Sequence, residues 1–325
     1  MNVISINDVA PVRIGQAQNF EAGTGCTAFI CPEGMCAGLD VRGGGPASRE
    51  SQLLQPLTVA QKIHGIVLAG GSAFGLGAAD GVMKYLEEQG IGFDVNVTHV
   101  PLVAQSDLFD LTVADGSIRP DAAMGYEAAK NALENPNYRD GNYGAGTGCT
   151  VGKICGMEYC MKTGIGSYAI EIDGLKIGAV VALNSFGDIY DWKSGKKVAG
   201  LLNKEKDGFE NTADVLVSNV RSINNIYSSN TTLAVVITNA KFDKSALCKI
   251  ASLCHDGYAR SVRPVHTSFD GDSIYAVSAG DFKADPDVVG TIAADVVSEA
   301  ILNAVKNAES AYGFPAAKDP GLRIF

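Results

Sequence analysis

An abrupt change in composition at residues 230 and 231 constrains this chain more than any other feature. A polar segment rich in Asn and Ser runs up to Asn230, and the apolar, β-branched run 231–238 that follows predicts a buried strand. Two threonines open that strand, and a structural role is the common explanation for such a pair. The alternative is a self-cleaving precursor. Cleavage after Asn230 would give Thr231 a free α-amine, whose ordinary pKa of about 7.7–8.0 suits a base, beside a hydroxyl nucleophile.

The length and charge of the chain set broad limits on its class. It has 325 residues, of which 46% are hydrophobic, and this suffices for one large domain or two ordinary ones. The formal net charge of −10 argues against nucleic acid or an anionic membrane surface as the main partner. The N-terminus lacks the basic and apolar regions of a signal peptide, and no run of about 18 apolar residues indicates a membrane span. We therefore expect a cytoplasmic protein with no nucleic-acid or membrane partner.

The cysteines and histidines do not form a recognisable metal motif. The eight cysteines are separated by at least four residues, so none forms a C-x-x-C pair. The four histidines form no close pair in the sequence. We expect no metal site and no cofactor. We also expect reduced thiols, several of them as small core residues.

Hydrophobic periodicity predicts a chain that mixes strands and helices. The expected strands are 27–31, 37–41, 63–69, 167–172 and 175–183, with a turn at 32–34 between the first two. Asp173-Gly174 predicts a hairpin between the last two strands. The expected helices are 77–90, 122–133, 244–259 and 287–308. Residues 193–229 have the most linker-like composition.

Glycine-rich turns are candidate walls of a site. Strand 63–69 runs into Gly70-Gly71-Ser72 and a helix, which is the setting of a serine nucleophile elbow, but phenylalanine replaces the second glycine of that motif. We therefore expect Ser72 to be a helix N-cap or a close-packing residue. The loop 141–153 has glycines that allow close backbone approach, and it ends in the lone cation Lys153. A third run, 42–46, lacks the order of a P-loop, so phosphate binding is not predicted.

Polar residues beside expected strands are further candidates. Asn184 follows strand 175–183 at the start of a loop, where catalytic donors often lie. Asp270 and Asp272 suit paired acid–base catalysis or metal binding. No third ligand is near them in the sequence. We therefore interpret the two aspartates as turn-forming residues or as residues with a supporting hydrogen-bond role.

Several of these stretches, taken together, resemble the DmpA-type peptidases. That family includes L-aminopeptidase/D-esterases, β-aminopeptidases and nylon-oligomer hydrolases. The matching stretches follow the family's order across nearly the whole chain. They are 42–50, 70–82, 141–153, 180–188, 230–232 and 256–272.

The resemblance implies a fold of the α+β class, a four-layer α/β/β/α sandwich like that of N-terminal-nucleophile hydrolases but with different strand connectivity. It implies a single domain, 1–325, that cleaves itself into chains 1–230 and 231–325. It also implies a homo-oligomer, a tetramer or larger, that acts without a cofactor on small peptides, amides or esters.

The resemblance also assigns roles to residues of this chain. Thr231 matches the nucleophile, Lys153 the active-site lysine, and Asn184 the asparagine that stabilises the oxyanion. Asp270 and Asp272 match carboxylates that support the nucleophile and the cleavage site. Such roles meet the needs of amide hydrolysis, which requires a nucleophile, a proton acceptor and donors aimed at the developing oxyanion.

The expected substrate pocket includes Phe109, Asn142, Gly144 and Gly146. Nylon-oligomer hydrolases have tyrosine where Phe109 stands, so a role that depends on that hydroxyl is absent here. Asn239 is a second departure, because the family pattern leads us to expect Asp there.

The sequence therefore predicts an autoprocessed amide hydrolase that acts as an aminopeptidase, amidase or esterase. Two alternatives stay open. One is an acyltransferase of the ornithine acetyltransferase type, whose usual Lys-Gly before an Ala-Thr cleavage motif is missing here. The other is an uncleaved, non-enzymatic family member that acts as a binding or scaffold protein.

Overall fold

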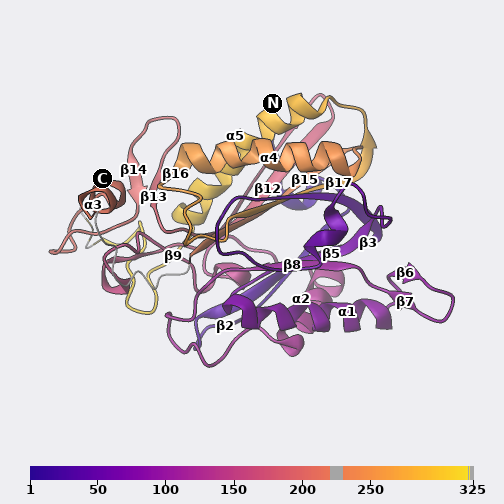
Figure 1. The fold of residues 1–325 in the computed structure, drawn as a ribbon, viewed down its shortest axis with the longest axis horizontal. Coiled ribbons are helices and arrows are strands. Elements are labelled where there is room, and N and C mark those ends of the chain that lie inside the picture. Colours follow the sequence, from indigo (N-terminus) through magenta and orange to yellow (C-terminus); the bar gives the residue numbers. More distant parts are fainter. Residues whose placement is uncertain (220–229, 321, 323–325) are drawn as a thin grey trace.

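The structure stacks two β-sheets between two layers of helices (Figure 1). This computed structural model describes residues 1–219, 230–320 and 322. Helices α4 (Lys244–Ser261) and α5 (Pro286–Lys306) cover one sheet, and α1 (Ala78–Glu88) and α2 (Ala122–Glu134) cover the other. The short helix α3 (Thr212–Ser218) lies to one side of these layers. The predicted four-layer α/β/β/α sandwich is therefore confirmed.

The first sheet carries the residue that the sequence marks as a nucleophile. Its strands are, in spatial order, β1 (Asn2–Val3), β11 (Ile165–Ile172), β12 (Leu175–Asn184), β15 (Thr231–Ala240), β17 (Ser273–Phe282) and the C-terminal part of β3 (Thr24–Val41). Neighbouring strands are antiparallel except for β15 and β17, which are parallel.

The long strand β3 belongs to both sheets. Its residues 36–41 pair with β17, whereas its residues 24–30 pair with β2 (Arg13–Asn19) and, from residue 26, with β5 (Ile63–Ala69). The second sheet continues from β5 to β8 (Val103–Asp107) and β4 (Ala47–Arg49). The prediction of two strands separated by a turn at 32–34 is wrong. Pairing on both sides of a register shift keeps the chain extended there, with Gly34 absorbing the irregularity at a φ of +75°.

Short strands form small satellite sheets. They are β6 (Phe93–Asp94) with β7 (His99–Val100), β9 (Thr150–Val151) with β10 (Met161–Lys162), and β13 (Asp188–Tyr190) between β14 (Lys197–Ala199) and β16 (Val262–Arg263). Short 3-10 helices lie at Ile6–Asp8, Ser51–Leu54, Ser72–Gly77, Gly144–Gly146 and Met157–Tyr159.

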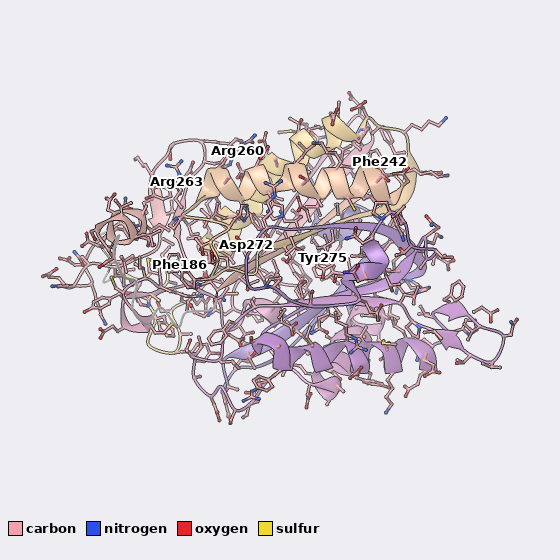
Figure 2. The ribbon with its side chains drawn as sticks, in the orientation of Figure 1. Phe186, Phe242, Arg260, Arg263, Asp272 and Tyr275 are labelled. Carbon is pink, nitrogen blue, oxygen red and sulfur yellow. The ribbon has the colours of Figure 1, made fainter. Side chains whose placement is uncertain are left out.

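Three apolar clusters fill the spaces between the layers. Strand β15 shows why its sequence is continuously apolar: Ala234 and Val236 face helices α4 and α5, while Leu233 and Val235 face the second sheet. Tyr275 on β17 lies between the sheets, where its hydroxyl is 2.6 Å from Ser106 Oγ (Figure 2). Burial of each large apolar side chain contributes about 1.5–3 kcal/mol, so both faces of β15 stabilise the sandwich.

Local patterns correctly predicted the four longest helices and strands β5, β11, β12 and β15. The hairpin between β11 and β12 is confirmed, and Asp173 and Gly174 both have positive φ, at +48° and +88°, as a two-residue type I′ turn requires. The four predicted helices are confirmed within two residues at each end. In the linker-like segment 193–229, the structure forms β14 and α3, and residues 220–229 lie outside the described part of the chain.

Helix α5 alone among the described residues is long and apolar enough to cross a bilayer. Its most apolar window is 67% buried inside the protein, as expected for a core helix. The helix begins with Asp285 as N-cap, whose side chain accepts from the Asp287 and Val288 amides, and Pro286 occupies the first turn.

Candidate active site

The sheet register places Thr231 directly beside Asn184. Strand β15 begins at Thr231, strand β12 ends at Asn184, and the two residues are partners in the antiparallel ladder. Both are buried, with Thr231 at 3% exposure. Side chains directly opposite each other have Cβ atoms about 4.5–5.5 Å apart, so the predicted nucleophile and the predicted oxyanion donor are neighbours.

Lys153 joins this pair through Asn184. Its Nζ donates to Asn184 Oδ1 at 2.7 Å and to the Asn184 carbonyl at 3.1 Å. The Thr150 amide also donates to Asn184 Oδ1, at 3.1 Å, which fixes the orientation of the side-chain amide. Asn184 Nδ2 donates to the Phe109 carbonyl at 2.9 Å. An amide nitrogen carries two hydrogens, so one remains to be directed at a substrate oxygen.

The environment of Lys153 suits proton transfer. Its side chain is almost fully buried, and burial lowers the pKa of Lys153 to about 8. The neighbouring thiols of Cys160 and Cys149 and the carboxyl groups of Asp270 and Asp110 oppose that shift. A substantial fraction of Lys153 is therefore an uncharged amine at mildly alkaline pH, and that form can accept a proton.

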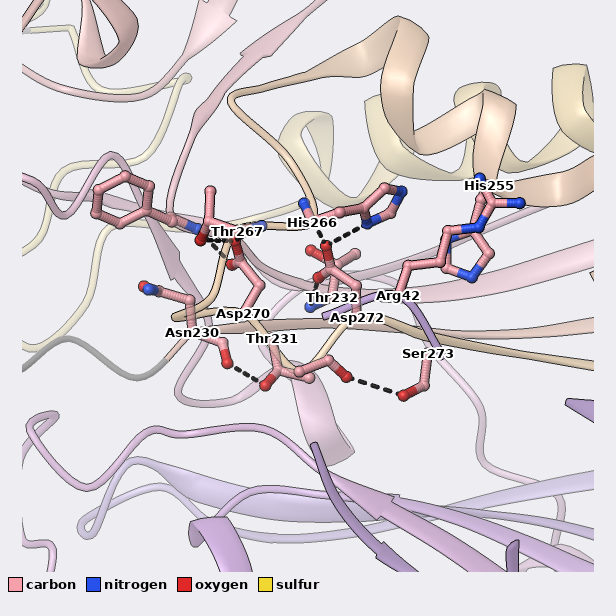
Figure 3. A network of polar contacts seen from close by, with 12 residues as sticks. Arg42, Asn230, Thr231, Thr232, His255, His266, Thr267, Asp270, Asp272 and Ser273 are labelled. Carbon is pink, nitrogen blue, oxygen red and sulfur yellow. Dashed lines mark hydrogen bonds and ion pairs between the residues drawn. The ribbon is translucent and has the colours of Figure 1, made fainter. Parts of the chain in front are cut away.

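Asp272 and Asp270 hold the start of β15 and the loop beside it (Figure 3). Asp272 Oδ1 accepts from the Thr232 amide at 2.8 Å. Asp270 accepts from the Phe186 amide at 3.3 Å and from the Thr267 hydroxyl at 2.6 Å. Burial, together with the adjacent charge of Asp272, raises the pKa of Asp270 to about 6.

The peptide bond between Asn230 and Thr231 lies within this cluster. The Thr231 hydroxyl donates a hydrogen bond to the Asn230 carbonyl, as drawn in Figure 3. The Asn230 amide donates to the Phe269 carbonyl at 3.1 Å, so the loop that carries Asp270 also holds the residue before Thr231. A Cβ atom at Gly271 would lie 2.6 Å from Thr231 Oγ1, which explains why this loop has glycine at its closest approach.

The glycine run 42–46 packs against the same loop. The Gly44 and Gly45 amides donate to the carbonyls of Thr267 and Asp270, at 3.2 and 2.8 Å. A Cβ at Gly43 would lie 2.4 Å from both the Asp270 carbonyl oxygen and the Asp272 nitrogen. The run therefore supports the aspartate loop through its backbone.

The residues predicted for the substrate pocket lie in different settings. The Phe109 carbonyl contacts Asn184 directly. The Asn142 side chain instead pairs with the backbone of Glu309, donating at 2.8 Å and accepting at 3.1 Å, so the structure does not bring it into the Thr231 cluster. Gly144 and Gly146 allow tight packing, because added Cβ atoms would lie 2.2 Å from Thr27 Oγ1 and 2.3 Å from the Ile165 nitrogen. Their contact with substrate stays a prediction.

Ser72 is not the helix N-cap that the sequence suggested. Gly71, with a φ of +84°, is the N-cap of the 3-10 helix Ser72–Gly77, and no side chain caps that end. Ser72 itself has a φ of +53°, and its amide donates to the Leu108 carbonyl at 2.9 Å. A residue whose backbone is left-handed cannot also have the extended backbone geometry of a typical N-cap residue.

Replacing Ser72 by alanine is expected to change self-cleavage and amide hydrolysis by no more than about twofold, since Ser72 takes no part in the hydrogen bonds described for Thr231, Lys153 and Asn184. Rates of both reactions for Ser72→Ala and the unmodified protein check this. Complete loss of hydrolysis with cleavage intact would instead restore Ser72 as a nucleophile.

The sequence analysis did not single out Asp110, whose carboxylate connects several backbone segments beside the site. Its carboxylate accepts from the Gly71 amide and the Thr24 hydroxyl, both at 2.7 Å. Burial raises the pKa of Asp110 to about 6, while Lys153 opposes the shift. A Cβ at Gly148 would lie 2.6 Å from the Asp110 Cβ. Asp110 thus joins three glycine-containing segments, and its only sequence signal was a carboxylate within the apolar stretch 108–111.

Sequence reasoning also missed a pair of histidines. His255 of α4 and His266 of the aspartate loop are not close in sequence, yet their ring centroids are 4.7 Å apart. Among the described residues, no group of three His, Cys, Asp or Glu side chains is arranged to hold a metal ion.

Known proteins resemble this chain over most of its length. Peptidase family S58 matches residues 4–318. An uncharacterized aminopeptidase of Mycobacterium leprae is 33% identical, covering 96% of this chain and 92% of the relative. A 6-aminohexanoate-oligomer endohydrolase of Agromyces is 27% identical, covering 92% of this chain and 85% of the relative. The L-aminopeptidase D-Ala-esterase/amidase of Ochrobactrum anthropi, a variant of the Ntn hydrolase fold, superposes with a TM-score of 0.71 at 19% identity, covering 97% of this chain and 91% of that structure.

Proposed function

This chain belongs to peptidase family S58, and we propose that it is an autoprocessed N-terminal-threonine hydrolase of small peptides, amides or esters. Membership of this family makes it an enzyme that hydrolyses peptide or amide bonds. The proposal adds the nucleophile, Thr231, and its origin in cleavage after Asn230. The family match favours hydrolysis over the acyltransferase alternative.

One observation carries the proposal: the β12–β15 register sets Asn184 opposite Thr231. Around that pair, Lys153 contacts Asn184 and Asp272 holds the Thr232 amide. The residues proposed as nucleophile, proton acceptor, oxyanion donor and supporting carboxylate therefore lie together around the first residue of one strand. Rigid strands supply this geometry, and such preorganisation favours catalysis.

Self-cleavage would use the Thr231 hydroxyl on its own upstream carbonyl. Oγ1 attacks the carbonyl carbon of Asn230, the peptide C–N bond breaks, and the nitrogen gains a proton, which leaves an ester on Thr231. Water then hydrolyses this ester, releases the Asn230 carboxylate and restores the hydroxyl. Because the uncleaved chain has no α-amine at Thr231, another base must take the hydroxyl proton, and the Lys153 amine is suited to this by its lowered pKa.

Substrate hydrolysis would follow the same course on another carbonyl. The Thr231 hydroxyl attacks the substrate carbonyl, and its own α-amine takes the proton and returns it to the leaving amine. The positive charge of Lys153 nearby lowers the pKa of the new α-amine and keeps it a free base. Asn184 donates to the oxyanion, and water completes the turnover by cleaving the acyl-threonine ester.

The names of the relatives guide the choice of substrates. An aminopeptidase, an oligomer endohydrolase and an aminopeptidase with esterase and amidase activity all cleave amides or esters. We propose short peptides, aminoacyl amides and esters as first substrates. We also propose a cytoplasmic homo-oligomer, a tetramer or larger.

The intact mass of the purified protein under denaturing conditions tests the proposal most directly. We expect two species that together account for residues 1–230 and 231–325, with Thr231 at the N-terminus of the smaller one. A single unbroken chain that persists for days, without hydrolysis of any aminoacyl amide or ester, would favour the non-enzymatic alternative.

Replacing Asn184 by alanine is expected to lower kcat for amide hydrolysis by roughly 10²–10³-fold, the usual effect of removing one oxyanion donor. KM should change little, because the lost hydrogen bond forms mainly in the transition state. Steady-state kinetics check this, with Asn96→Ala in the exposed β6–β7 hairpin as the matched control. An unchanged kcat would remove Asn184 from the site.

A further inference from the structure

His266 lies behind Asp272, on the side away from Thr231 (Figure 3). One Asp272 oxygen, Oδ2, accepts from the His266 amide at 3.1 Å and contacts His266 Nδ1 at 2.8 Å. The other oxygen, Oδ1, accepts from the Thr232 amide at 2.8 Å. Asp272 is 1% exposed, so these contacts determine where its carboxylate points.

The hydrogen-bond partners assign the proton on each histidine ring. A carboxylate accepts only, so His266 Nδ1 carries a hydrogen, and His266 Nε2 is buried without a partner among the described residues. His255 Nε2 faces the Asp40 carbonyl at 3.1 Å and carries a hydrogen for the same reason. His255 Nδ1 is also buried without a partner in the described part of the chain.

A second proton on His255 would be costly, because it would create a buried N–H without an acceptor among the described residues. It would also place a charge beside the His266 ring, 4.7 Å away at an interplanar angle of 74°. Burial lowers the pKa of His255 to about 4, and both His266 and Arg42 contribute to that shift, while Asp40 opposes it. Tyr258 also faces the two histidines. Its ring is 6.1 Å from that of His266, and burial raises the pKa of its hydroxyl.

The backbone of His266 has an unusual conformation. Its φ of +58° is a left-handed conformation that side chains other than Gly, Asn and Asp adopt rarely. The residue keeps this conformation while its amide and its ring both bond the same carboxylate oxygen. Unfavourable backbone geometry that surrounding contacts maintain is typical of functional positions.

We propose that His266, with a hydrogen on Nδ1, is a positioning residue that fixes Asp272 so that Asp272 holds the chain at Thr231. The Nδ1–H and the amide of His266 direct Oδ2 of Asp272, so that Oδ1 is held on the amide of Thr232, next to Thr231. This inference rests on the proposed function, because it concerns Thr231 as the nucleophile.

The tautomer is measured directly by NMR of the protein labelled with 15N-histidine. The chain has only four histidines, so single variants assign the signals. At pH 7 we expect the His266 signals to show a proton on Nδ1. A proton on Nε2 alone would overturn the proposal, and this result does not depend on whether the protein is active.

Two variants separate positioning from folding. His266→Gly removes the ring and tolerates positive φ, while His266→Asn tolerates positive φ and places a side-chain N–H near the position of Nδ1. We expect His266→Gly to lower the self-cleavage rate and kcat at least about tenfold with KM unchanged, and His266→Asn to recover most of both. His99→Asn in strand β7, which is exposed, serves as the control.

Each outcome has a distinct meaning. A His266→Gly protein with the kcat and cleavage rate of the unmodified protein would overturn the positioning role. A His266→Asn protein as slow as His266→Gly would also overturn it, because the donor would then be irrelevant. If the unmodified protein neither cleaves nor hydrolyses, the proposed function fails, and the NMR result alone then decides whether His266 orients Asp272.

Discussion

Replacing Thr231 by alanine is expected to leave one full-length chain and to abolish amide hydrolysis. The Thr231 hydroxyl lies against the Asn230 carbonyl, and the same hydroxyl is the proposed nucleophile for substrate. Without it neither reaction can start, and the rate should fall by roughly 10⁶-fold, as for other nucleophile deletions. Denaturing mass spectrometry follows the cleavage, and release of a chromogenic amine from an aminoacyl amide follows the hydrolysis.

The serine variant is the matched control for this experiment. Thr231→Ser keeps the hydroxyl and loses only a methyl group, so we expect it to cleave itself and to retain measurable hydrolysis. The Thr231→Ala protein should still fold and melt cooperatively, because the β15 ladder does not depend on this side chain. A Thr231→Ala protein that hydrolyses normally would eliminate Thr231 as the nucleophile.

Replacing Lys153 by methionine is expected to slow self-cleavage by roughly 10²–10⁴-fold, the range of general acid–base catalysis. Hydrolysis should also slow, because the charge that keeps the Thr231 α-amine a free base is lost. Methionine keeps an unbranched side chain in this buried position but has no amine to accept a proton or to donate to Asn184. Because burial lowers the pKa of Lys153 to about 8, the free amine becomes the main form as pH rises through that value. Self-cleavage of the unmodified chain should therefore accelerate between about pH 7 and 9.

The pH profile distinguishes a base from a structural residue. In Lys153→Met the acceleration around pH 8 should disappear, and the residual rate should depend much less on pH. Cleavage is measured after refolding the uncleaved chain at each pH. A Lys153→Met protein that keeps both the normal rate and the rise around pH 8 would show that another group is the base. A substitution of Lys84 on α1, outside the site, provides the control.

The four longest helices and several of the longer strands could be predicted from the sequence because their signals are local. The apolar run after Asn230 became β15, and Asp173-Gly174 became the tight turn of the predicted hairpin. Helix α5 followed its periodic apolar residues. Such signals depend on dihedral preference and on the spacing of side chains, which neighbouring residues largely determine.

The site itself could be predicted only in part. Resemblance to a family indicated Thr231, Lys153 and Asn184, and the register of β12 and β15 brought Thr231 and Asn184 together. Gly271 drew no prediction, although a side chain there would collide with the Thr231 hydroxyl. Nothing in an Asp-Gly-Asp sequence reveals that approach, because the colliding atom comes from a residue forty positions earlier in the chain.

The sequence by itself therefore determined the four longest helices, several strands and the point at which a polar segment gives way to a buried strand. Only the tertiary structure decided that β3 spans both sheets, that Asp110 joins three glycine segments, and that His255 and His266 meet beside Asp272. The physical reason is the range of the forces involved. Backbone preferences act between neighbours, whereas buried polar groups must find partners wherever the packed chain supplies them.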